Sequence, residues 1–201
     1  MKIFVAVPAR LHSKRLPGKI LKEIGGIPMI KRVLQRCAAA KIPNDVVLCT
    51  DSSQLVNDAN DWGFKSLLTS KDCKSGSERL ASVVNDIVGD NNLKDSLIIN
   101  VQGDQPFIDP DIIDLLATKF MNYKTLPAVI TPVYKLNPNK VENPNIIKTL
   151  LAADGRILYF SRSVIPYIRD VDRKNWNQHN YFWGHVGVYG YRGDILEQWR
   201  D

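Results

Sequence analysis

The first half of the chain alternates short apolar runs with longer segments whose apolar residues recur at helical spacing. Residues 3–7, IFVAV, are apolar throughout, which is typical of a parallel strand buried on both faces. In the segment 25–43, Pro28 lies in the expected first turn of a helix and Pro43 ends it. This alternation predicts an α/β fold built on a doubly wound, mostly parallel sheet. The predicted strands cover residues 3–7, 45–50, 64–70 and 96–104, and the predicted helices cover residues 25–43, 51–63 and 75–89.

The second half of the chain has a different pattern, with more strand signals than helical ones. In residues 146–162, the pair Asp154-Gly155 lies between two apolar runs, which is a strong signal for a two-residue β-hairpin. Residues 166–184 are polar and aromatic without periodicity, and they predict a long loop. Further strands are predicted at residues 127–136 and 185–192, followed by a helix from residue 193.

Composition and charge narrow the class of protein. The 201 residues are 44% hydrophobic and 24% charged, which is ordinary for a globular protein. The formal net charge is +6, but the basic residues are scattered among acidic ones rather than gathered in a run or a helical stripe. This patterning favours a solubilising surface with a local anion pocket over nucleic-acid binding.

Hydropathy and cysteine usage predict the location of the protein. No apolar run approaches the roughly 20 residues that span a bilayer, and Met1 leads directly towards a strand rather than a signal peptide, so we expect no membrane insertion. Cys37 and Cys49 have the apolar surroundings of core residues, whereas Cys73 lies in a polar loop as a free thiol. Three cysteines without a CxxC motif suit a reducing compartment, which predicts a cytoplasmic location.

Three polar stretches lie where ligands bind in open parallel sheets: residues 7–19, 75–79 and 102–106. The first, VPARLHSKRLPGK, is neither a Walker A loop nor a GxGxxG loop. Gly18 permits a close approach of the backbone, and the cations of the loop suit a polyphosphate gripped from the side. An ordinary basic surface loop explains the composition equally well. The cations are Arg10, Lys14, Arg15 and Lys19.

The other two stretches carry a helix cap and a carboxylate. In SGSER, Ser75 and Glu78 have the spacing of an ordinary capping box, and that interpretation is favoured for either residue taken singly. In NVQGDQP, Asp104 follows an apolar strand, which places a carboxylate at the rim of the sheet, where Mg²⁺ bound to phosphates would sit. A Gly-Asp turn explains this stretch equally well when it is taken alone.

Taken together, five stretches in order resemble the 3-deoxy-manno-octulosonate (Kdo) cytidylyltransferases. They are VPARLHSKRLPGK, SGSERLA, NVQGDQP, YFSRSVIP and HVGVYGYR, and the resemblance runs along the whole chain. It implies transfer of CMP from CTP to Kdo with release of pyrophosphate, for lipopolysaccharide synthesis, with Mg²⁺ as cofactor. It also implies a sheet of the nucleotide-diphospho-sugar transferase type and a homodimer. The acylneuraminate cytidylyltransferases share this fold, but SGSER and FSRSVIP favour the Kdo branch.

The resemblance implies roles for individual residues. Those matched to catalysis are Arg10, Lys19 and Asp104, and Asp104 is also the matched metal ligand. Those matched to nucleotide binding are Pro8, Ala9, Arg10, Arg15, Lys19, Ser75 and Arg79. Those matched to the sugar pocket are Gln102, Arg162, His185 and Tyr189. Because Kdo is a carboxylate, Arg162 and His185 would pair with it. Without the resemblance, His185 is more typical of a half-buried strand histidine.

Two departures from the family pattern bear on activity. Gln105 stands where the family usually has Glu, which removes a charge near the expected metal. Family members also continue beyond the last stretch with a segment that supplies a second Mg²⁺-binding Asp, which the 201 residues do not contain. We therefore interpret residues 1–201 as one C-terminally incomplete nucleotidyltransferase domain, either a fragment or a shortened protein. Its CTP-binding half covers residues 1–125, and its sugar-binding and dimerisation half covers residues 126–201.

Three alternatives stay open. The chain acts on another acid sugar, such as an 8-amino Kdo analogue or a sialic acid; it binds CTP without catalysis; or it binds RNA non-specifically, with a steep salt dependence. We expect residues 1–201 alone to bind CTP weakly and to make CMP-Kdo slowly or not at all. Full-speed synthesis would mean that another carboxylate replaces the missing one, with Asp51 and Asp194 the first to test.

Overall fold

The computed structural model describes residues 1–11, 16–179 and 181–200, which form two compact units. The first unit consists of Met1–Ile130 and Val188–Asp201, and the second consists of Thr131–Gly187. The chain from Val188 onwards therefore belongs to the first unit, whereas the sequence analysis assigned all of residues 126–201 to the second half.

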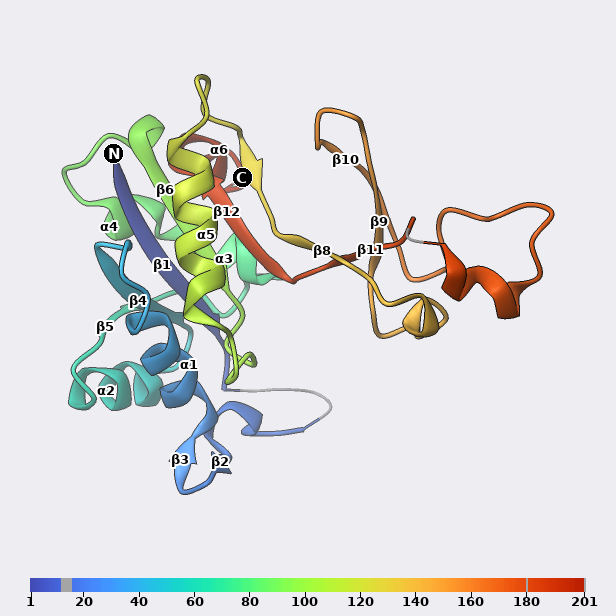
Figure 1. Cartoon of the computed structure of the whole chain (residues 1–201). Coiled ribbons are helices and arrows are strands. Elements are labelled where there is room, and N and C mark those ends of the chain that lie inside the picture. Colours follow the sequence, from blue (N-terminus) through green and yellow to red (C-terminus); the bar gives the residue numbers. More distant parts are fainter. Residues whose placement is uncertain (12–15, 180, 201) are drawn as a thin grey trace. The chain divides into compact units, whose positions relative to one another are not determined.

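A six-stranded sheet forms the centre of the first unit, in the order β5-β4-β1-β6-β12-β7 (Figure 1). The strands β5, β4, β1 and β6 are parallel, whereas β12 pairs antiparallel with both β6 and β7. The predicted doubly wound, mostly parallel sheet is therefore confirmed. The strands are β1 Lys2–Ala9, β4 Asp45–Thr50, β5 Lys65–Leu68, β6 Ser96–Val101, β7 Val129–Ile130 and β12 Val188–Arg192.

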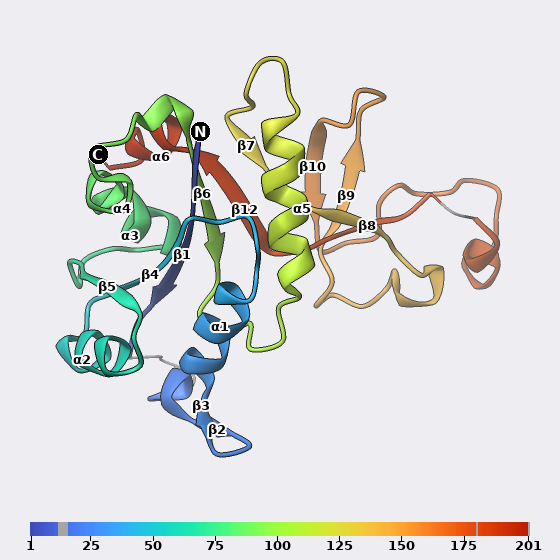
Figure 2. The same ribbon diagram turned by 60° about the vertical axis from the view of Figure 1, so that its left-hand side comes forward.

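Helices cover both faces of this sheet. Helices α1 and α5 contact each other on one face, and α3, α4 and α6 gather on the opposite face (Figures 1 and 2). The predicted helix 75–89 is interrupted at Val83, whose φ of −126° and ψ of 19° are not helical. The helices are α1 Met29–Ala38, α2 Ser53–Asp61, α3 Gly76–Ser82, α4 Val84–Val88, α5 Pro110–Met121 and α6 Gly193–Glu197, with short 3₁₀ turns η1 Lys19–Leu21 and η2 Leu93–Asp95.

The strand order places a ligand site between two central strands. β1 is followed by β4 and β5 on one side, and the chain then returns to add β6 on the other side of β1. Both strands are buried along their length, apart from Lys2 at the start of β1. The carboxyl ends of β1 and β6 therefore diverge into separate loops at the point where the strand order reverses, which is where open α/β sheets bind ligands.

The start of α1 differs from the prediction. Gly25 and Gly26 have φ values of 56° and 73°, and they form the two-residue turn of a small hairpin between β2 Glu23–Ile24 and β3 Ile27–Pro28. Two successive left-handed residues favour such a turn over a helix start. Pro28 consequently has an extended ψ of 137°, and the helix begins one residue later, at Met29.

The two strands predicted at 127–136 and 185–192 are each divided between two sheets, and the single-strand predictions are wrong in this respect. The first yields β7 and then β8 Val133–Lys135, with Pro132 between them. Proline lacks the N–H that continuous pairing needs, so it breaks a strand at this point. The second yields β11 Trp183–His185 and then β12, and both divisions coincide with the boundary between the units.

Helix α5 was not among the elements predicted from the sequence, although its sequence signals are clear. Asp109 caps it by accepting a hydrogen bond from the N–H of Asp111, and Pro110 occupies the first turn. Ile113, Leu116 and other apolar residues at helical spacing are buried. The helix therefore packs one face onto the sheet, as the spacing predicts.

The second unit contains a four-stranded antiparallel sheet in the order β10-β9-β11-β8. The hairpin predicted at Asp154-Gly155 is confirmed, but its loop has three residues rather than two, because the N–H of Ala152 donates to the carbonyl of Arg156. The predicted loop 166–184 includes the 3₁₀ helix η4 Arg173–Gln178 and the start of β11. The remaining elements are β9 Lys148–Leu151, β10 Ile157–Ser161 and η3 Pro138–Lys140, and the core side chains are Leu136, Val141, Trp176 and Phe182.

Candidate active site

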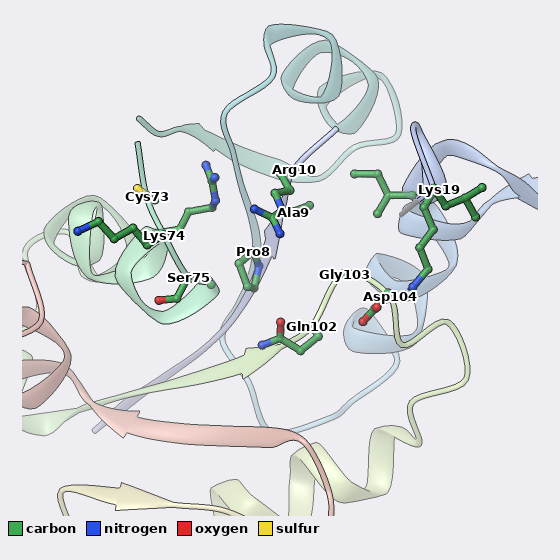
Figure 3. Close-up of a pocket in the computed structure, with 14 residues that line it drawn as sticks. Pro8, Ala9, Arg10, Lys19, Cys73, Lys74, Ser75, Gln102, Gly103 and Asp104 are labelled. Atoms are coloured by element: carbon green, nitrogen blue, oxygen red, sulfur yellow. Dashed lines mark hydrogen bonds and ion pairs between the residues drawn. The ribbon is translucent and has the colours of Figure 1, made fainter. Parts of the chain in front are cut away.

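A cleft of about 470 Å³ opens at the carboxyl ends of β1 and β6 (Figure 3). Ala9 and Arg10 reach it from the end of β1, Gln102 and Asp104 from the end of β6, and Ser75 from the loop before α3. The cleft thus brings together the three polar stretches singled out in the sequence. The lining residues are Pro8, Ala9, Arg10, Leu16, Lys19, Ile20, Cys73, Lys74, Ser75, Gly76, Arg79, Gln102, Gly103 and Asp104.

An ion pair crosses one end of the cleft. The Lys19 ammonium donates to the Asp104 carboxylate over 2.8 Å, and both side chains are about half exposed. Gly18, just before Lys19, has a φ of 63°, and no atom lies within 4 Å of a Cβ built there. Glycine therefore suits the left-handed backbone at this position, and the close approach of a ligand to Gly18 stays a prediction. This backbone turn directs Lys19 towards the end of β6.

Close packing at Gly103 brings the ends of the two central strands together. A Cβ at Gly103 would lie 3.1 Å from the carbonyl oxygen of Pro8 and 3.3 Å from the Cβ of Ala9. A side chain at Gly103 would push apart the loops that follow β1 and β6. It would also separate Arg10 from Asp104, because Arg10 directly follows Ala9 and Asp104 directly follows Gly103.

The predicted capping box at α3 is confirmed. The Ser75 hydroxyl accepts a hydrogen bond from the N–H of Glu78 over 3.1 Å, and the Glu78 carboxylate accepts one from the N–H of Lys74 over 2.9 Å. These bonds fix the loop that carries Lys74 and Ser75 along the cleft wall. A contact of Ser75 with nucleotide stays a prediction.

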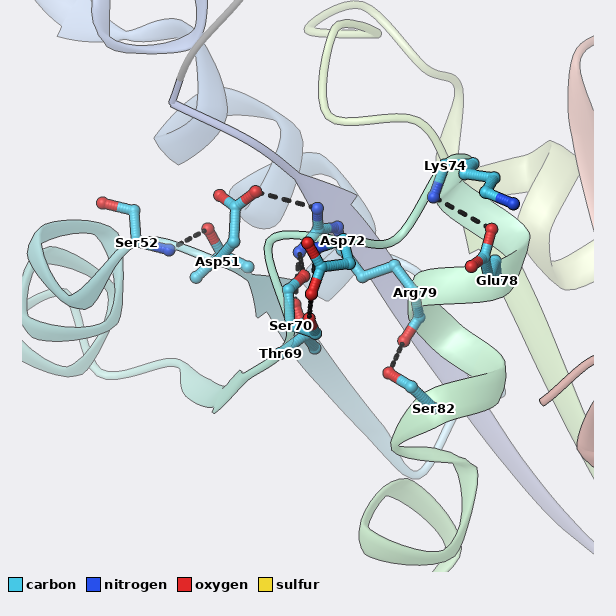
Figure 4. A network of polar contacts seen from close by, with 10 residues as sticks. Asp51, Ser52, Thr69, Ser70, Asp72, Lys74, Glu78, Arg79 and Ser82 are labelled. Carbon is cyan, nitrogen blue, oxygen red and sulfur yellow. Dashed lines mark hydrogen bonds and ion pairs between the residues drawn. The ribbon is translucent and has the colours of Figure 1, made fainter. Parts of the chain in front are cut away.

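Arg79 anchors the same loop from below. Its side chain is only 3% exposed, and its guanidinium donates to the Thr69 hydroxyl, to the Ser70 carbonyl over 3.2 Å and to the Asp51 carboxylate over 2.9 Å (Figure 4). Arg79 therefore ties α3 to the ends of β5 and β4. Its predicted contact with the nucleotide also stays a prediction, because these bonds already use much of its donor capacity.

Arg10 is an exposed cation between two cavities. It lines the main cleft and also a neighbouring cavity of about 440 Å³, which Asp51, Ser52, Ser53 and Lys71 line as well. Within the described ranges, no ion pair is recorded for Arg10, so its guanidinium is available for an anion. Arg15, the predicted helper of this cation, lies outside the described residues.

Two of the four predicted sugar-binding residues lie in the first unit. The side-chain amide of Gln102 donates to the buried Asn100 over 3.0 Å, which orients Gln102 at the cleft wall. Tyr189 stacks on Tyr191 with ring centroids 6.0 Å apart, and burial raises the pKa of the Tyr189 hydroxyl.

The other two predicted sugar-binding residues lie in the second unit. Arg162 is exposed, and its guanidinium donates to the carbonyl of Pro144 over 2.8 Å. The Nε2 of His185 lies 2.9 Å from the Thr131 hydroxyl, and the ring contacts that of Phe160 with centroids 4.7 Å apart. Burial lowers the pKa of His185, which favours the neutral imidazole. The half-buried strand position expected for His185 is confirmed, and its role stays a prediction.

The remaining carboxylates named in the sequence are engaged elsewhere. Asp51 is paired with Arg79, and Asp194 forms a two-pronged pair with Arg192 over 2.5 and 3.0 Å. Neither lines the main cleft, where Asp104 is the only carboxylate among the described lining residues. The described part of the chain also contains no group of three or more His, Cys, Asp or Glu side chains suited to a metal ion.

All three cysteines behave as predicted. Cys37 and Cys49 are buried, and burial raises the pKa of each thiol to about 12, so they are inert core residues. Cys73 is a free, partly exposed thiol in the cleft wall, which the sequence did not place there.

Several cleft residues escaped the sequence analysis. Lys74 adds a fourth cation to the described wall, beside Arg10, Lys19 and Arg79, and Leu16 and Ile20 add apolar surface. Lys74 adjoins the SGSER stretch and Leu16 lies within the opening loop, so their position beside the predicted motifs could have indicated that they line the site.

No helix in the described part of the chain has the length and apolar character needed to cross a membrane.

Comparisons with known proteins agree with this geometry. The family model described as "Cytidylyltransferase" matches residues 4–201. A 3-deoxy-manno-octulosonate cytidylyltransferase from Chloroherpeton thalassium is 36% identical over 199 residues, which cover 98% of this chain and 76% of the relative. One with the same name from Legionella pneumophila is 37% identical over 193 residues, covering 96% and 73%.

A solved structure shares the fold. The structure of CMP:2-keto-3-deoxy-manno-octonic acid synthetase complexed with CTP superposes with a TM-score of 0.87 at 32% identity. The match covers 99% of this chain and 77% of that chain. The chain therefore spans about three quarters of the length of these relatives.

Proposed function

This chain belongs to the cytidylyltransferase family, and from that membership we propose that it transfers CMP from CTP to Kdo, giving CMP-Kdo and pyrophosphate for lipopolysaccharide synthesis. One observation carries the proposal: all six described residues that were matched to CTP line a single cleft at the reversal of the strand order. They are Pro8, Ala9, Arg10, Lys19, Ser75 and Arg79.

The reaction needs no nucleophile from the protein. The anomeric hydroxyl of Kdo attacks the α-phosphorus of CTP, the bond from this phosphorus to the bridging oxygen breaks, and pyrophosphate leaves while the hydroxyl proton is lost. Arg10 and Lys19 are flexible cations at the cleft, suited to the charge of the triphosphate and of the departing pyrophosphate. The chain thus contributes position and positive charge.

Asp104 fits the proposed Mg²⁺ cofactor. Mg²⁺ is usually held by one or two carboxylates together with water and substrate phosphates, and Asp104 offers one accessible carboxylate in the cleft. The ion would supply charge neutralisation on the phosphates. The Lys19 ammonium donates a hydrogen bond to this carboxylate. Movement of the ammonium to a bound phosphate would leave Asp104 available for the ion.

Calorimetric titration of CTP with and without Mg²⁺ tests the metal assignment. Asp104→Asn should abolish the Mg²⁺-dependent gain in CTP affinity, whereas Asp90→Asn, an exposed loop carboxylate, should leave it intact. A normal gain in the Asp104 variant would show that this residue only shapes the turn.

A homodimer is the proposed assembly. β10 is an edge strand of the second sheet, and Leu158, Tyr159 and Phe160 on it are exposed. A second copy would cover this apolar edge. Light scattering of the chain and of a Leu158→Lys variant tests this, because a dimer that uses the edge should dissociate in the variant.

The proposed location is the cytoplasm, where CTP is made.

The function is tested by product analysis. The chain is incubated with CTP, Mg²⁺ and either Kdo or N-acetylneuraminate, and CMP-sugar and pyrophosphate are measured. We expect CMP-Kdo at a low rate from the 201 residues, and a higher rate when they are joined to the C-terminal segment that the resemblance to the Kdo cytidylyltransferases implies. Failure of both forms with Kdo would contradict the proposal, and product with N-acetylneuraminate alone would reassign the sugar.

A further inference from the structure

Lys148, which the sequence analysis did not single out, is a fully buried cation in the second unit. It begins β9, and its ammonium donates three hydrogen bonds to backbone carbonyls: to Asn143 over 3.1 Å, to Ile146 over 2.9 Å and to Arg162 over 2.6 Å. No carboxylate pairs with it among the described residues, so its printed hydrogen-bond acceptors are all neutral carbonyls.

These contacts require the charged form of Lys148. A neutral amine has two N–H donors and a lone pair, and a lone pair facing a third carbonyl oxygen would be repelled. Three acceptors within 3.1 Å therefore fit three donors, as only the ammonium supplies. Burial and the neighbouring Arg162 charge lower the pKa of Lys148. Hydrogen bonds from an ammonium to carbonyls stabilise the charged form, so the three bonds of Lys148 oppose this lowering.

Lys148 and Arg162 hold the same loop from two directions. The ammonium binds the carbonyl of Arg162 and those of Asn143 and Ile146, while the guanidinium of Arg162 binds the carbonyl of Pro144, between them. The backbone and the side chain of Arg162 are thus both fixed against residues 143–146. Loss of the ammonium would release the backbone end of this arrangement.

The sheet register places Lys148 between Ser161 and Gly184, which directly precede the two residues matched to the sugar carboxylate. On one side, Ser161 of β10 pairs with Lys148, and Arg162 follows directly. On the other side, Gly184 of β11 pairs with Lys148, and His185 follows directly. Arg162 and His185 therefore extend from the two strands that flank Lys148.

We propose that Lys148 is the positioning residue for carboxylate recognition in the second unit, holding Arg162 in place and adding an uncancelled positive charge behind it. The proposal rests on the proposed function, in which the acceptor sugar is a carboxylate. A merely structural lysine would stabilise the unit without any preference for a charged ligand.

The test uses the full chain and two ligands, Kdo and its methyl ester, in which a methyl group removes the negative charge of the carboxylate, with dissociation constants measured by calorimetry. Lys148→Met should weaken Kdo binding by about tenfold or more, as expected for lost support of a charge-assisted contact, and ester binding by less than about twofold. Lys174→Met is the matched control, because Lys174 is an exposed lysine of the same unit, paired with Asp172, and should change neither constant.

A double variant separates positioning from direct action. If Lys148 acts through Arg162, then Lys148→Met should weaken Kdo binding far less in an Arg162→Met background than in the original chain. If Lys148→Met does not fold, Lys148→Gln keeps two donors without the charge, and the same selective loss of Kdo binding is expected.

The outcomes are distinguishable. Equal losses for Kdo and its ester, or no loss in a folded Lys148 variant, would overturn the role of Lys148 while leaving the proposed function intact. An unsubstituted chain that binds neither Kdo nor the ester would overturn the proposed function, and the inference with it.

Discussion

Among the residues that the structure describes, each unit buries one basic side chain, and the two units stabilise it in different ways. In the first unit, Arg79 is 3% exposed and donates to the carboxylate of Asp51 as well as to Thr69 and Ser70. In the second unit, Lys148 is fully buried and bonds only to carbonyls. Arg79 therefore has its charge cancelled locally, whereas Lys148 keeps a net charge.

From this difference we expect Arg79 to stabilise the fold and Lys148 to act in ligand recognition. A cancelled charge has little effect beyond its own contacts, so Arg79 acts by fixing the cleft wall. A buried charge without an anion is costly in an empty site and becomes favourable when an anionic ligand arrives. The comparison predicts that substitution of Arg79 chiefly affects stability and that substitution of Lys148 chiefly affects ligand charge preference.

The largest expected effect is on the ion pair of the first unit. Arg79→Met leaves the carboxylate of Asp51 partly buried without its partner, which should reduce the free energy of unfolding by about 3–5 kcal/mol. Urea unfolding measures this. Arg156→Met, which breaks the exposed pair with Asp154, is the control and should leave the urea midpoint nearly unchanged.

The partner substitution sharpens this prediction. Asp51→Asn added to Arg79→Met removes the uncompensated charge, so part of the lost stability should return. Arg79→Met with wild-type stability would show that the pair does not hold the cleft wall.

The matched change in the second unit should cost less. Lys148→Met leaves three neutral carbonyls short of a donor rather than an isolated ion, and we expect a loss of about 1–3 kcal/mol. The same urea titration applies, with Lys174→Met as the control. A loss larger than that of Arg79→Met would mean that the carbonyl cage stabilises Lys148 better than the carboxylate stabilises Arg79, and the comparison would fail.

An exposed cation of the first unit should affect binding and not stability. Lys19→Ala is expected to weaken CTP binding roughly 10- to 100-fold, as for loss of a hydrogen bond to a charged group, with the urea midpoint unchanged. Lys22→Ala, an exposed lysine of the same loop, should leave both values as they are. Unchanged CTP affinity in the Lys19 variant would remove it from the phosphate grip.

The smallest expected effect concerns the pair of Asp194 and Arg192 at the start of α6. The hydrogen bonds from Arg192 hold the pKa of Asp194 below its ordinary value of 3.8. A carboxyl with a lowered pKa stabilises the fold above the ordinary value, and this contribution is lost as the pH falls through the lowered one. Asp194→Asn should therefore cost about 1 kcal/mol at pH 7, and this cost should shrink as the pH falls below 3.8 and vanish below the lowered pKa, as measured by a series of urea titrations from pH 7 into acid. A deficit that persists in acid would contradict the pairing.

Much of the first unit was determined by the sequence itself. The run at residues 3–7 is apolar at every position, and residues 46–49 and 97–99 form similar shorter runs, a pattern typical of strands buried on both faces, so the parallel sheet was predictable. Helix ends with local chemistry were predictable too, as the Ser75–Glu78 cap shows. The helix Pro110–Met121 carries equally good local signals, so it too was predictable from the sequence.

Only the tertiary structure decided what depends on contacts between distant residues. Thr69 and Asp51 meet Arg79 because the ends of β5 and β4 lie beside α3, and no periodicity in the sequence marks that meeting. Pro132 marks a break between strands, but which sheet each strand joins depends on pairing partners far along the chain. Lys148 appears in the sequence as one more surface lysine, and its burial follows from three carbonyls that only the folded loop and strand bring together. Local patterns specify elements because their causes lie within a few residues, whereas burial of a charge depends on partners that folding alone supplies.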